Sequence, residues 1–174
     1  MMSRRIKNIS KPLENVVLYL NSGLPATNTT IRKITNSAGT NNTEITFFIS
    51  PITISEYSVL KVMSIAHASS SHASQHGNSV LQFRLGNSIQ YNPDLYRSND
   101  NSAPILFAMS YTDNEPAYWS NIEGIYLPPQ TINSITLILS DDLANPAGGI
   151  DKDLNFIIGL VFQEYDRKYS DVEN

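Results

Sequence analysis

The sequence predicts an all-β domain built as a two-sheet β-sandwich. From residue 43 to residue 164, short apolar runs follow one another, and in most of them apolar and polar residues alternate with the period of a strand. Asn, Ser, Pro and Gly separate these runs, and no segment of any length has the period of a helix. A chain of 174 residues with 41% hydrophobic residues is sufficient for one domain with a full core.

The domain is predicted to span residues 13–166. Residues 1–12 are expected to form a flexible basic arm, and residues 167–174 a frayed, charged tail. The arm contributes +4 to a net charge of −4, so the rest of the chain carries −8 and repels nucleic acid and anionic membranes. Only the arm is expected to attract nucleic acid, and only weakly. The cations of the arm are Arg4, Arg5, Lys7 and Lys11.

Alternation and turn residues place the strands of the first half of the chain. The strand at residues 43–50 is expected to end at Pro51, because proline has no N–H for the ladder. Gly86-Asn87 predicts a tight hairpin turn. In the strand before this turn, Phe83 is expected to point inward and Arg84 outward. The expected strands are residues 16–20, 30–34, 43–50, 57–66, 79–85 and 88–91.

The second half of the chain follows the same pattern. Pro128-Pro129 is expected to stop one strand, and Ile135, Leu137 and Leu139 are expected to lie buried in the next. Residues 111–121 are interpreted as a loop that holds the only Trp. The expected strands are residues 105–109, 122–127, 134–140 and 154–162.

Eight of these strands are long enough to count as main strands, and several of the connections between them are long. A single eight-stranded jelly roll needs such connections, whereas a meander needs only tight hairpins. We therefore predict a jelly roll. An immunoglobulin-like sandwich is the competing topology, although its strands are usually spaced more regularly.

The sequence predicts neither an enzyme nor a cofactor site. It lacks the nucleophile-elbow, zinc-protease and phosphate-loop motifs, and it has no Cys for thiol catalysis, zinc binding or disulfides. Two clusters invite a metal interpretation, but neither has the spacing of a defined site, so both are interpreted as solvated loops. The first contains His67, His72 and His76, and the second contains Asp141, Asp142, Asp151 and Asp153.

Two segments are candidates for contacts with a partner. Tyr118 and Trp119 follow several polar residues, so they are interpreted either as a sugar-stacking platform or interface anchor, or as a Trp that closes the core. The basic arm is interpreted as a disordered end, as a weak nucleic-acid arm, or as a tether that becomes ordered on a neighbouring subunit. No apolar run approaches the length of a membrane-spanning helix, so no membrane insertion is expected.

The segment from Ile125 to Asp142, IYLPPQTINSITLILSDD, resembles a stretch in jelly-roll structural proteins of large icosahedral double-stranded DNA viruses and their relatives. There, a Pro-containing turn leads into an alternating aliphatic strand that ends in Asp. A Gly-bearing loop and a final apolar strand follow, here Gly148-Gly149 and residues 154–162.

This resemblance implies a minor capsid, penton or cement protein of the virion, assembled in the host cytoplasm. Its partners would be copies of itself and other capsid subunits, and the family has no catalytic residues to carry over. The family's major capsid protein has two fused jelly rolls, for which 174 residues are too few. The alternative is a carbohydrate- or receptor-binding sandwich, which the segment around Tyr118 and Trp119 motivates.

Overall fold

The chain folds into two antiparallel β-sheets. The structure is a computed structural model that describes residues 15–25, 27–35, 37, 39, 41–68, 80–92, 103–110, 117–120, 123–140, 150–151 and 155–164. Within these residues there are eleven strands and no helix, so the all-β prediction is confirmed. No helix long and apolar enough to cross a membrane occurs among the described residues. The strands are β1 (Val16–Asn21), β2 (Ile31–Thr35), β3 (Asn41–Ile54), β4 (Ser58–Ala68), β5 (Val80–Leu85), β6 (Ile105–Ser110), β7 (Ala117–Ser120), β8 (Ile125–Leu127), β9 (Gln130–Ser140), β10 (Ile150–Asp151) and β11 (Asn155–Glu164).

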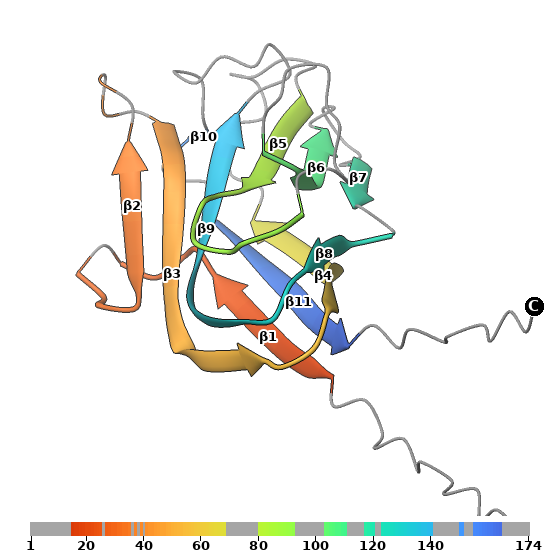
Figure 1. The fold of residues 1–174 in the computed structure, drawn as a ribbon. Helices are drawn as coiled ribbons and strands as arrows, with labels where there is room; N and C mark the ends of the chain where they lie inside the picture. The colour runs from red at the N-terminus through yellow and green to blue at the C-terminus, as the bar shows by residue number, and fades with distance from the viewer. Residues whose placement is uncertain are drawn as a thin grey trace, which may run out of the picture.

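The sheets differ in size, and Figure 1 shows them as two layers. Sheet A has four strands in the order β1-β11-β4-β8. Sheet B has seven, in the order β10-β3-β9-β5-β6-β7, with β2 paired to β3. When β2, β7 and β10 are set aside, eight strands remain. These pair in a nested order: β1 with β11, β3 with β9, β4 with β8 and β5 with β6. The predicted two-sheet sandwich is therefore confirmed.

Four phenylalanines join the two sheets in the core. Phe83 on β5 stacks on Phe107 on β6, with ring centroids 4.0 Å apart. Phe156 on β11 meets these rings edge-on at 5.1 and 6.3 Å, and Phe47 on β3 at 6.4 Å. All four are at most 3% exposed. Sheet A thus inserts one ring among three rings of sheet B, which fixes how the sheets face each other.

The alternation predicted for the last strand is confirmed. Phe156, Ile158, Leu160 and Phe162 of β11 are all buried in the core, whereas Ile157 is 44% exposed on the other face. The same holds for Phe83, Ile135, Leu137 and Leu139, which lie inward as predicted. Period-two alternation therefore assigned the core-facing side of both sheets.

The prediction that Pro51 ends its strand is wrong, because β3 continues to Ile54. The register between β3 and β9 shifts between Phe48 and Ile52, so Pro51 lies where the ladder is interrupted and needs no N–H partner. The inward-facing positions change phase there: Ile45 and Phe47 are buried before the shift, and Ile54 after it.

The predicted hairpin at Gly86-Asn87 is also wrong. β5 pairs with β6 and β9, and residues 88–91 form no strand. Gly86 instead extends the contact with β9, since its N–H donates to the Thr136 carbonyl at 2.8 Å. A Cβ on Gly86 would lie 2.8 Å from Thr136 Cγ2, so glycine is needed here for close approach and not for a hairpin turn.

One further prediction needs correction. The loop predicted at residues 111–121 contains strand β7, which pairs with β6 through Ala117–Ser120. Arg84 lies on the outer face of sheet B, as predicted, and it is only 9% exposed there. Its guanidinium donates to the Ala103 carbonyl at 2.8 Å and to Gln82 Oε1 at 2.7 Å, which satisfies the charge on a covered part of the sheet.

Candidate interaction surfaces

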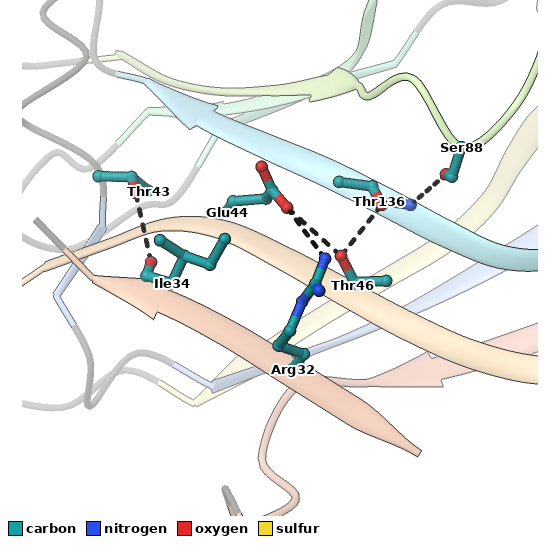
Figure 2. A network of polar contacts seen from close by, with 7 residues as sticks. All are labelled: Arg32, Ile34, Thr43, Glu44, Thr46, Ser88 and Thr136. Carbon is teal, nitrogen blue, oxygen red and sulfur yellow. Dashed lines mark hydrogen bonds and ion pairs between the residues drawn. The ribbon is translucent and has the colours of Figure 1, made fainter. Parts of the chain in front are cut away.

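The outer face of sheet B has a hydrogen-bonded polar network at its centre. The hydroxyls of Thr46 on β3 and Thr136 on β9 lie 3.0 Å apart, and both residues are buried by their neighbours. The Thr136 N–H donates to Ser88 Oγ at 2.8 Å. Figure 2 shows this network running across β3 and β9. Polar groups that already bond one another offer little to an apolar partner, and the exposed apolar side chains of this face are Ile34 (42%) and Phe48 (44%).

Charged residues continue this polar face to its edge. Arg32 on β2 and Glu44 on β3 approach to 3.8 Å, with side chains 60% and 32% exposed, as Figure 2 also shows. An exposed pair of this kind contributes about 0–1 kcal/mol of stability, so it marks a solvated surface more than a stabilising contact.

Along β1 and β11, the outer face of sheet A is different, because it is uncharged and largely apolar. No charged residue faces outward on these two strands, over residues 17–21 of β1 and 157–163 of β11. Lys61 on β4 lies beside Val161 on the same face. Three of the outward side chains on β1 and β11 are markedly exposed: Val17 (45%), Tyr19 (63%) and Ile157 (44%). We call Val17, Tyr19, Ile157 and Val161 the apolar patch.

Gly159 at the centre of the apolar patch lets Tyr19 lie across the sheet. A Cβ at Gly159 would lie 3.0 Å from Tyr19 Cε1 and 2.5 Å from Ser64 Oγ on β4. The Tyr19 ring therefore passes over the backbone of β11, where any larger residue would displace it. Exposed apolar groups gathered on one face are typical of a contact surface.

The edges of the two sheets are not equally protected against pairing with another chain. On β2, an edge strand of sheet B, Lys33 shares the inward face with buried Ile31 and Ile45, and its partial burial lowers the pKa of its ammonium. An inward-pointing charge is one way in which proteins block an edge. β7 and β8 are short, with four and three residues, and Pro128-Pro129 follows β8.

β1 carries none of these protections. It has six residues, pairs with β11 in an uninterrupted register, and has no described strand on its other side. Residues 15–25, which include β1, contain no charged side chain, and their one proline, Pro25, lies beyond the strand. Figure 1 shows β1 at the border of sheet A, beside β11. β1 is therefore an exposed, apolar edge strand, the kind that readily accepts another strand.

The backbone hydrogen bonds between β1 and β11 show which residues of β1 direct their N–H and C=O groups to the open edge. The Ser22 N–H donates to the Phe156 carbonyl at 2.9 Å, so Ser22 faces β11. Antiparallel pairs alternate, so Leu20, Leu18 and Val16 also bond to β11. Val17 and Tyr19 then direct their N–H and C=O groups away from β11, toward the open edge.

The residues predicted from the sequence fall elsewhere. Arg4, Arg5, Lys7 and Lys11 lie outside the described residues. Tyr118 and Trp119 lie on β7, at the positions paired with Met109 and Ala108. β7 pairs with β6 and ends the strand order of sheet B on that side, so the interpretation of these two residues as a contact site stays a prediction.

Most members of the two clusters with a metal interpretation lie outside the described residues. His67 lies in β4 and Asp151 in β10, and the described residues contain no group of three or more metal-ligating side chains. The other members, His72, His76, Asp141, Asp142 and Asp153, lie outside the described residues.

The apolar patch and the edge of β1 were not predicted from the sequence. The signal for them is the uncharged run from Val16 to Leu20, which predicts a strand but does not show which side of it stays unpaired. Comparison of the chain with family models, with curated proteins and with solved structures found no match.

Proposed function

We propose that this protein is a non-enzymatic structural protein of a virus particle, which forms or cements an icosahedral capsid, as a minor capsid or penton subunit, through contacts between subunits. The observation that carries the proposal is the contrast between the two outer faces. The outer face of sheet B has a hydrogen-bonded polar centre. Sheet A presents Val17, Tyr19 and Ile157 to solvent beside β1, which has no described strand on its other side. A face of the second kind is expected to be covered by another subunit.

The order of strand pairing supports the same proposal. Nested pairing of eight strands, from first with last to fourth with fifth, is what a jelly roll requires, and jelly rolls are common in viral capsids. The fold alone does not carry the function, because the same architecture serves lectins and enzymes. The apolar patch is what favours assembly over those uses.

Two substitutions of matched exposure test the proposal. Ile157 on the outer face of sheet A is 44% exposed, and Ile34 on the outer face of sheet B is 42% exposed. We expect Ile157→Lys to abolish self-association in sedimentation velocity, and Ile34→Lys to leave it unchanged. Mass spectrometry of purified particles from the source organism should detect the chain. A wild-type protein that stays monomeric and is absent from particles contradicts the proposal.

Carbohydrate or receptor binding is the second candidate, and it is motivated by Tyr118 and Trp119. Both residues belong to β7, the strand that ends the order of sheet B beside β6. A glycan-array screen tests this candidate. Binding that is lost in Trp119→Ala would favour it over capsid assembly, and an array on which the wild type binds nothing would remove it.

A further inference from the structure

The open edge of β1 has a sequence that fits a second copy of itself. We propose that two copies of the chain pair through β1, antiparallel about a twofold axis, so that sheet A of one protomer continues into sheet A of its partner. This inference rests on the proposed function, because it names one of the contacts through which subunits would assemble.

The sequence of β1 and its flanking residues is nearly self-complementary. Residues 15–21 read Asn-Val-Val-Leu-Tyr-Leu-Asn, which is close to a palindrome centred on Leu18. A twofold axis at Leu18 sets Val17 opposite the partner's Tyr19, Val16 opposite the partner's Leu20 and Asn15 opposite the partner's Asn21. Apolar residues then meet apolar residues and amides meet amides, and no charge is brought against its own copy.

The backbone hydrogen-bonding groups of β1 favour the same register. Val17 and Tyr19 both direct their N–H and C=O groups to the open edge, so a register that sets Val17 against the partner's Tyr19 joins two residues that can exchange hydrogen bonds. If the register shifted by one residue, a residue whose N–H and C=O groups point to the open edge would lie opposite a residue whose groups already bond to β11. A slip of two would set an asparagine against Val17 or Tyr19. Only the register centred on Leu18 satisfies both the backbone and the side chains.

This pairing would also cover exposed apolar side chains of β1. Val16 is 38% exposed and Leu18 is half-buried, although both belong to the inward-facing row of β1. They lie at the rim of the sandwich, where no further described strand closes the inner layer. A partner strand would cover this rim, and it would bring the apolar patches of the two protomers side by side on one face.

Single cysteines test the register, since the chain has no Cys of its own. Leu18 would lie opposite itself in a non-hydrogen-bonded pair, where Cα atoms are about 4.5 Å apart, a distance that a disulfide can span. The matched control is Tyr19→Cys, which is more exposed but would lie opposite Val17. We expect mild oxidation to cross-link Leu18→Cys into a covalent dimer and to cross-link Tyr19→Cys at least about tenfold more slowly.

A proline pair tests the hydrogen bonds. Val17→Pro removes an N–H that points to the open edge and leaves the ladder to β11 intact, so the fold should persist. Lys33→Pro is the control. The Phe48 N–H donates to the Thr30 carbonyl, and residues of an antiparallel pair alternate in bonding to the neighbouring strand, so the Lys33 N–H points to the open side of β2. We expect Val17→Pro to raise the dimer dissociation constant at least about tenfold, or about 1.4 kcal/mol, and Lys33→Pro to leave it unchanged.

The outcomes separate this inference from the proposed function. Equal cross-linking of the two cysteine variants overturns the inference, as does an oligomer that Ile157→Lys disrupts but Leu18→Cys cannot trap. Cross-linking that appears only when residues 1–14 are deleted would assign the edge to the chain's own N-terminal segment, and also overturns it. In these cases the capsid proposal stands. A protein that is monomeric and absent from particles overturns the capsid proposal.

Discussion

Replacing Phe156 by Ala should be the most destabilising single change in the fold. The side chain is 1% exposed, and its ring contacts the rings of Phe47, Phe83 and Phe107 across the two sheets. Truncation of a buried Phe costs about 3–5 kcal/mol, and edge-on ring contacts are worth about 0.5–1.5 kcal/mol each beyond the area they bury. We therefore expect a loss in the upper part of that range, close to 5 kcal/mol.

The neighbouring residue provides the control. Ile157 follows Phe156 on β11 but lies on the outer face with 44% exposure, so Ile157→Ala should cost about 1 kcal/mol or less. Urea unfolding of dilute protein measures both free energies, and the slope m should stay the same in both variants. In a chain of this size, the melting temperature should fall by about 10–20 °C for Phe156→Ala. Equal losses in the two variants would mean that the faces of β11 are assigned wrongly.

Three further predictions concern backbone strain, buried hydroxyls and the edge of β2. Gly124 (φ 81°) and Gly39 (φ 68°) both have left-handed backbones, but only at Gly124 would a Cβ clash, 2.4 Å from Val59 Cγ1. Gly39→Ala should therefore cost about 1 kcal/mol in thermal unfolding and Gly124→Ala at least about 2 kcal/mol, and equal costs would refute the clash. Thr46→Val should cost about 1–2 kcal/mol by leaving the Thr136 hydroxyl unpaired, and adding Thr136→Val should cost less than the sum of the single changes in a double-mutant cycle. Burial lowers the pKa of Lys33 in the folded state, so the buried charged ammonium reduces the free energy of unfolding. This loss of stability diminishes as pH rises through the lowered pKa, because the ammonium then loses its proton in the folded state. Lys33→Met should stabilise the monomer at neutral pH, by a margin that shrinks at high pH, and should promote aggregation in light scattering; a margin independent of pH would contradict this explanation.

The faces of the strands could be predicted from the sequence, but the irregularities could not. Alternation identified the buried rows of β5, β9 and β11, because burial on one side imposes a two-residue period. Alternation fails at Met63 on β4. There β4 has one extra residue, because its register with β11 shifts between Gly159 and Leu160. Such a bulge changes which face the later residues occupy, and nothing in the local sequence announces it.

The candidate surface was beyond sequence prediction for a different reason. Whether Val17 and Tyr19 border an open edge depends on the order of strands in sheet A, where β1 pairs with the last strand of the chain. That order is set by contacts between residues more than a hundred positions apart, such as Ser22 with Phe156. Local pattern assigned the strand, and only the three-dimensional pairing shows that one side of it is unprotected.

Light scattering on the wild-type chain over a series of concentrations tests most directly whether the outside of this sandwich is its working part. The chain has a mass of 19.4 kDa. The apolar patch and the open edge of β1 predict a weight-average mass that rises with concentration toward twice this value or a higher multiple. A mass that stays at that of one chain at every concentration would contradict the assignment of sheet A as a contact surface.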